Sequence, residues 1–149
     1  MKNKPIYLCC LFNKSSENMV VKKMVNEDLL RTLFVKKSLK NNDNGFQCEM
    51  KNSISDATII EPIKVELKGD SIEGKEKYKE FTIEINEEKI ENKSISEQKP
   101  GNFSVKSKAT MYFKRDEPLP VGKYKIRFTR LLTEEYGDIP FSHKERIRE

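Results

Sequence analysis

The chain has 149 residues, of which 36% are hydrophobic and 36% charged, and its formal net charge is +5. This length suits one domain with a small core. The positive charge is spread along the chain, whereas dedicated nucleic-acid-binding proteins concentrate it. No apolar stretch is long enough to span a membrane.

The first residues, MKNKPIYLCCLF, place two lysines before a short apolar run at residues 6–12. This run lacks the small residues of a signal-peptide cleavage site. We therefore predict a buried first strand and a cytoplasmic or assembly-associated protein, with an extracellular location as the alternative.

The three cysteines, Cys9, Cys10 and Cys48, have neither the even count of a disulfide framework nor the paired spacing of a zinc site. We interpret them as small buried side chains in a reducing compartment. A bridge from Cys48 to Cys9 or Cys10 is the alternative. We predict no cofactor and no metal site.

A helix is predicted over residues 27–39. One straight helix over residues 19–40 would place its valines and its leucines on opposite sides, so a break at Asn26 is expected. Asn26 can cap the helix, and Lys36, Lys37 and Lys40 favour its C-terminal end. Residues 1–56 are thus expected to form an N-terminal α+β extension that contains one short helix.

From residue 57 the hydrophobic period becomes two, in runs near residues 63–67, 81–85, 103–113 and 124–128. This period is typical of strands with one buried face and one exposed face. In EPLPVGKYKIRFT, Pro118 and Pro120 end one strand, and Gly122 permits the corner before the next. We predict a mainly β protein, with an antiparallel β-sandwich over residues 57–141 and a charged C-terminal tail over residues 142–149.

The stretch SVKSKATMYFKRDEPLPVGKYKIRFTRLLTEEYGDIPF, preceded by the strand FTIEINEEKI, contains a Pro-rich loop followed by a G-x-Y-x-I-x-F strand. This order resembles the bacterial immunoglobulin-like domains of surface-layer and adhesin-type proteins, over about residues 57–141. The resemblance implies an immunoglobulin-like sandwich without catalytic residues.

The chain offers no evident catalytic constellation. His143 is the only histidine and lies in the charged tail, so we predict no Ser–His–Asp triad. A cysteine-dependent enzyme, with His143 paired to Cys9, Cys10 or Cys48, is the least favoured alternative. We therefore predict a basic, non-enzymatic module for protein–protein interaction or structure, such as a component of a surface, phage or viral assembly.

Two surfaces are candidates for binding. A tyrosine among lysines on a strand suits a protein interface, so we predict an interaction face of Lys106, Lys108, Tyr112 and Arg115. The expected partner is a protein or a second copy of the chain. The alternative is nucleic-acid binding, with phosphates contacted by Lys36, Lys37 and Lys40, and also by Arg127 and Arg130.

Overall fold

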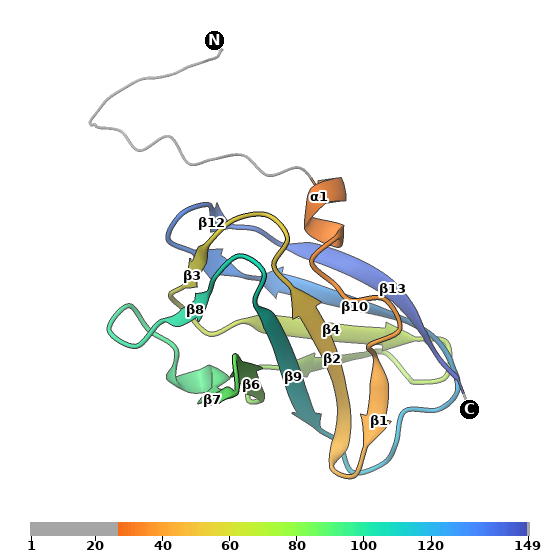
Figure 1. The fold of residues 1–149 in the computed structure, drawn as a ribbon. Helices are drawn as coiled ribbons and strands as arrows, with labels where there is room; N and C mark the ends of the chain where they lie inside the picture. Colours follow the sequence, from red (N-terminus) through yellow and green to blue (C-terminus); the bar gives the residue numbers. More distant parts are fainter. Residues whose placement is uncertain (1–26, 149) are drawn as a thin grey trace.

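Residues 27–148 are described in the computed structural model, so the strand expected at residues 6–12, with Cys9 and Cys10, lies outside the described residues. The described chain forms three antiparallel sheets and one short helix near its N-terminal end (Figure 1). This confirms the predicted mainly β, antiparallel class with a single short helix.

Helix α1 (Glu27–Arg31) begins where predicted but ends well before residue 39. The chain then runs beside β2 (Gly45–Lys51), where Val35 N–H donates to the Glu49 carbonyl at 3.0 Å and Lys51 N–H donates to the Leu33 carbonyl at 2.7 Å. This extended path stops the helix because it buries Leu33 and Phe34 while satisfying backbone groups of both segments.

The largest sheet has the order β1-β2-β9-β6-β7. Its central pair, β2 and β9, sets Cys48 opposite Met111. At the start of β2, a Cβ on Gly45 would lie 2.1 Å from the Phe113 carbonyl oxygen, so only glycine fits there. Besides β2, the strands are β1 (Lys40–Asn42), β6 (Thr82–Ile85), β7 (Glu88–Glu91) and β9 (Lys108–Lys114). Residues 40–51, assigned above to the N-terminal extension, therefore pair within this sheet.

The second sheet has the order β13-β10-β4-β5. One of its two central strands, β10, begins at Gly122, two residues after Pro120 in the Pro-rich corner. β13 lies in the stretch expected as a charged tail and pairs with β10 from Phe141↔Phe128 to Ile147↔Gly122. The strands are β4 (Lys64–Gly69), β5 (Lys75–Tyr78), β10 (Gly122–Arg130) and β13 (Phe141–Ile147).

Four short strands form a third sheet of order β12-β11-β3-β8, seen together at the left of Figure 1. They are β3 (Ala57–Ile59), β8 (Gly101–Phe103), β11 (Leu132–Thr133) and β12 (Gly137–Asp138). β8 ends at Phe103 and the chain turns, which leaves Val105 42% exposed although its place in the alternating run predicted a buried face.

The core lies between the two larger sheets. Phe113 stacks on Phe46 with ring centroids 4.8 Å apart, and the Phe81 ring packs against Phe113 with centroids 4.6 Å apart. Burying an aromatic or aliphatic side chain of this size contributes about 1.5–3 kcal/mol. The alternating runs thus fix which face of each strand is inside, and they leave the opposite face of β4, β10 and β13 to polar residues.

Candidate functional site

The outer face of the β13-β10-β4-β5 sheet is lined by basic side chains. The inward positions of β10, Tyr124, Ile126 and Phe128, are buried, so the alternate positions must point outward. The same alternation applies to the paired strands β4, β5 and β13. We define the basic face as the exposed cations of this surface: Lys64, Lys68, Lys75, Lys77, Lys123, Lys125, Arg127, Lys144 and Arg146.

Four lysines of the basic face stand in one row across the sheet. Lys144 lies opposite Lys125, which lies opposite Lys68, and Lys68 in turn lies opposite Lys75. Neighbouring strands are about 4.8 Å apart. Like charges directly opposite one another destabilise a sheet, so this row costs folding stability.

Acidic residues offset little of this charge. Glu66 lies on the same face between Arg127 and Lys77, and it forms an ion pair with Lys75 at 3.8 Å. Within residues 27–148, no other cation of the basic face has an ion pair. The face therefore keeps an excess of positive charge.

An open hollow of about 690 Å³ lies over part of the basic face. Two acidic residues, Asp70 and Glu145, line it among the cations Lys68, Lys123, Lys125, Lys144 and Arg146. Such a surface attracts anions electrostatically. It offers phosphate or carboxylate groups several ammonium donors at once.

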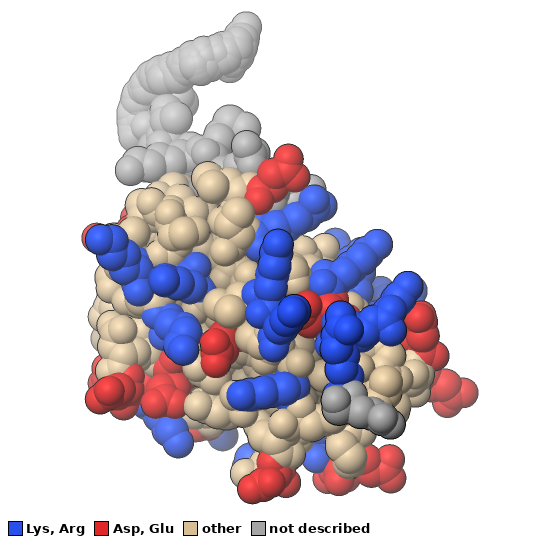
Figure 2. Space-filling view, turned by 45° about the vertical axis from the view of Figure 1, so that its right-hand side comes forward, with Lys and Arg blue, Asp and Glu red and all other residues tan. Residues whose placement is uncertain are grey.

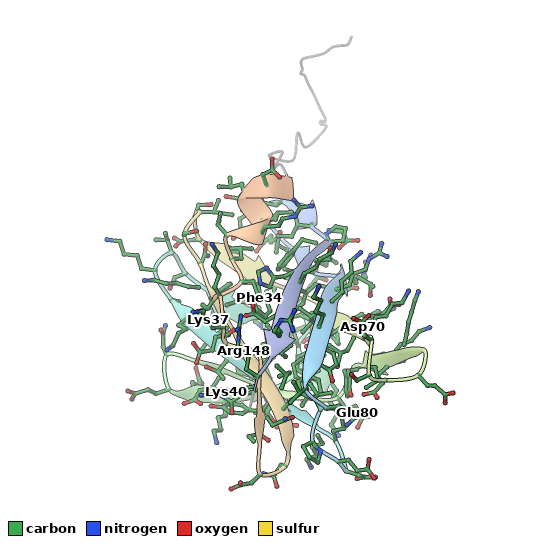
Figure 3. All side chains as sticks on the ribbon, turned by 90° about the vertical axis from the view of Figure 1, so that its right-hand side faces the viewer. Phe34, Lys37, Lys40, Asp70, Glu80 and Arg148 are labelled. Atoms are coloured by element: carbon green, nitrogen blue, oxygen red, sulfur yellow. The ribbon has the colours of Figure 1, made fainter. Side chains whose placement is uncertain are left out.

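At the edge of β13, Glu145 joins the sheet to the segment after α1. Its carboxylate accepts a hydrogen bond from the Lys37 backbone N–H and lies 3.7 Å from His143 Nε2. The His143 ring stacks on Phe34 with centroids 4.2 Å apart. Figure 3 shows Phe34 and Lys37 beside β13.

His143 is mainly a packed aromatic ring. Burial lowers the pKa of His143, and the Glu145 carboxylate opposes this shift. Nε2 is buried and has no hydrogen-bond partner among the described residues. A neutral imidazole near pH 7 fits this environment.

Cys48 is a buried free thiol. Burial, and then the nearby charges of Glu49 and Glu145, raise the pKa of the Cys48 thiol far above its usual range. Because the thiolate is the reactive form, Cys48 is inert near neutral pH.

The lysines predicted to contact nucleic acid do not lie at a helix end. Lys36 and Lys37 occupy a turn closed by the hydrogen bond from Ser38 N–H to the Val35 carbonyl (3.2 Å), and Lys40 begins β1. This differs from the prediction because α1 ends at Arg31.

The two arginines named with those lysines have different surroundings. Arg127 belongs to the basic face. Arg130 forms ion pairs with Glu61 at 3.1 Å and with Asp138 at 3.6 Å. Figure 2 shows another aspect of the molecule, on which Lys and Arg side chains are interspersed with Asp and Glu side chains.

Two of the four residues predicted to form an interaction face share one surface in the structure. Lys108 and Tyr112 share the outer face of β9, where Lys108 pairs with Glu49 at 3.6 Å. Lys106 lies in the preceding turn with φ 73°. Arg115 is placed apart from them, because its guanidinium binds Glu76 at 3.0 Å.

The basic face itself was missed from the sequence. Its signal was present, since the polar positions of KVELKG and GKYKIRFTR are mostly Lys or Arg. Each run alone reads as an ordinary solvated face, however. The basic side chains of the four strands form one surface only because the strands pair in the order β13-β10-β4-β5.

The family model of the hydroxymethylglutaryl-CoA reductase N-terminal domain matches residues 29–148, from α1 through β13. No curated protein matches the chain.

The family match corrects the resemblance stated above. The likeness to bacterial immunoglobulin-like surface-layer and adhesin-type domains is wrong, because the matching family is a reductase domain. The misleading signal was the Pro-rich corner before a G-x-Y-x-I-x-F strand. Such a motif indicates one alternating strand after a corner and is shared by unrelated sandwiches.

The predicted function is corrected as well. A non-enzymatic module of a surface, phage or viral assembly conflicts with a match to an enzyme family, as does the assignment to no enzyme class. The nucleic-acid alternative, which rested on a basic helix end, is dropped with it. The error arose because the absence of a catalytic constellation in one domain says nothing about the family of multidomain proteins to which such a domain can belong.

Proposed function

Because the chain belongs to the family of hydroxymethylglutaryl-CoA reductase N-terminal domains, we propose that it serves as an accessory domain of such a reductase. The observation that carries this proposal is the extent of the match. Residues 29–148 include the last three residues of α1 and every strand of the described fold. The family assignment therefore concerns the whole folded unit.

The chemistry of the described side chains supports an accessory role. The thiol of Cys48 is buried and protonated, and the ring of His143 is packed against Phe34. These groups are poor candidates for a nucleophile and a general base. On this proposal, the reduction of hydroxymethylglutaryl-CoA takes place in the catalytic part of the enzyme.

We place the contact with the catalytic part on the outer face of β9. Tyr112 presents its ring there and donates a hydrogen bond to Glu84 at 2.8 Å. The Nζ of Lys89 lies 5.7 Å from the centroid of the same ring. A tyrosine held by polar neighbours on a broad strand face suits a protein interface.

The buried free thiol of Cys48 also favours a reducing, cytoplasmic location.

The proposal is tested on the native gene product, isolated from its own cells through an affinity tag. The isolate is assayed for reduction of hydroxymethylglutaryl-CoA with a reduced nicotinamide as hydride donor. We expect reductase activity in the isolate and none with the purified 149-residue chain alone. Activity of the chain alone, or an isolate devoid of reductase activity, would overturn the proposal.

A further inference from the structure

We propose that the basic face docks this domain onto an anionic membrane surface, with its ammonium and guanidinium groups among the lipid headgroups. The membrane would be contacted peripherally. No helix within residues 27–148 is long and apolar enough to cross a bilayer. This inference goes beyond the proposed accessory role and does not depend on it.

The first argument is the cost of the lysine row. Lys144, Lys125, Lys68 and Lys75 repel one another across adjacent strands, and one ion pair to Glu66 compensates. A face that served folding alone gains nothing from this arrangement. An anionic plane laid over the row would relieve the repulsion of all four charges together.

The outer face of the other large sheet provides a comparison within the same molecule. There, Glu84 lies opposite Lys89, and Lys108 forms an ion pair with Glu49. Charges of both signs are interspersed, as expected for an ordinary solvated face. One like-charged pair, Lys51 opposite Lys108, occurs there. Of the two large sheets, only the basic face carries an unbroken row of four lysines across four strands.

The composition of the basic face favours a membrane over a protein partner. Protein interfaces are enriched in aromatic residues, Met and Arg, and they are depleted in Lys. On the described strands of this sheet, no Phe or Tyr side chain points outward. Tyr124, Phe128 and Phe141 are buried, and Tyr78 packs inward against Phe46 and Phe113. The cations are mostly lysines.

The same composition argues against nucleic acid. Single strands are bound by stacking bases on aromatic side chains, and the outward positions of this sheet provide none. Duplexes are read by a helix or a narrow β-ribbon inserted into a groove, whereas the cations here lie on the broad side of a four-stranded sheet.

The spacing suits simultaneous contact with a plane of headgroups. Rows of side chains recur about every 4.8 Å across the strands and about every 6.6 Å along them. The Debye length in physiological salt is about 8 Å, so neighbouring cations reinforce one another at the surface. Each Lys or Arg near an anionic bilayer strengthens binding by roughly fivefold.

The test is co-sedimentation of the full chain with vesicles, using neutral phosphatidylcholine and a mixture of phosphatidylcholine with phosphatidylserine. We expect binding to the anionic vesicles alone, and its loss in high salt. The triple variant Lys68→Gln, Lys125→Gln and Lys144→Gln should weaken binding by roughly 100-fold. Its melting temperature should equal or exceed that of the wild type, because like charges in the row are removed.

A matched control separates the basic face from net charge. The triple variant Lys89→Gln, Lys93→Gln and Lys99→Gln removes the same charge from other exposed sites, and we expect it to weaken binding less than about threefold. Equal weakening by both triple variants would overturn the proposal, as would undiminished binding to neutral vesicles. Tighter binding to nucleic acid than to anionic vesicles at equal salt, abolished by the first triple variant, would assign the face to nucleic acid instead.

Discussion

The guanidinium of Arg115 holds the carboxylate of Glu76 through two donors, with Nε and Nη2 each 3.0 Å from an oxygen. Arg115 follows β9 in one large sheet, and Glu76 lies on β5 in the other. The third nitrogen, Nη1, donates to the Glu117 carbonyl at 2.7 Å and the Pro118 carbonyl at 3.1 Å. The Arg115 side chain thus connects the two large sheets to each other and to the Pro-rich corner.

Replacing Arg115 should destabilise the fold even by Lys, which cannot form the paired contact. We expect Arg115→Lys to lower the free energy of unfolding by about 1–2 kcal/mol, measured by urea denaturation. The control is Arg146→Lys, because Arg146 is an exposed residue on the outer face of β13. That variant should change stability by less than about 0.5 kcal/mol. Equal losses in the two variants would contradict this account of Arg115.

Acid should destabilise the protein through His143. Burial lowers its pKa in the folded state below the ordinary value. The neutral ring therefore stabilises the fold above about pH 6.5, and this stability is lost as the pH falls through the folded-state pKa. We expect His143→Phe, which keeps an aromatic ring against Phe34, to show a smaller drop in melting temperature between pH 7.5 and about pH 5. Identical drops in the variant and the wild type would show that other groups control this range.

Asn92 should be intolerant of an isosteric change. Its side chain accepts from Ile63 N–H at 2.9 Å and donates to the carbonyls of Ile63 at 2.9 Å and Lys79 at 2.6 Å. Asn92→Asp replaces the donor by an oxygen facing two carbonyl oxygens. We expect a loss of about 2–4 kcal/mol in unfolding free energy. Asn102→Asp, at an exposed position, is the control and should be nearly neutral.

Cys48 should not react with thiol reagents in the folded protein. It is fully buried, and its thiol has a raised pKa. In a chain carrying Cys9→Ser and Cys10→Ser, we expect a colorimetric thiol reagent to react with Cys48 only after denaturation. Rapid reaction at neutral pH without denaturant would mean that the core around Met111 opens readily.

The sequence predicted the parts of the fold that depend on local patterns. The alternation of Tyr124, Ile126 and Phe128 identified a one-sided strand, and Pro118 and Pro120 marked the corner before it. The path after α1 was not predictable, because it depends on pairing with the distant residues Glu49 and Lys51. For the same reason β13 was missed, since its charged outer residues conceal a strand that is defined by pairing with β10.

The candidate site required information that no single segment contains. Lys68, Lys125 and Lys144 come from three strands distant in sequence and are adjacent only through the sheet register. Arg115 illustrates the opposite error. Its position beyond Tyr112 suggested a surface contact, but its actual partner, Glu76, comes from a strand of the other sheet. Long-range pairing decided both outcomes.

The central claim is that this chain is an accessory domain of a hydroxymethylglutaryl-CoA reductase. The most direct measurement is sedimentation velocity of the purified chain mixed with the separately produced catalytic part of the reductase from the same organism. We predict a complex that the double variant Lys108→Glu and Tyr112→Ala weakens by about tenfold or more, while Lys99→Glu leaves it intact. Two species that sediment independently at concentrations of about 50 µM would contradict the claim.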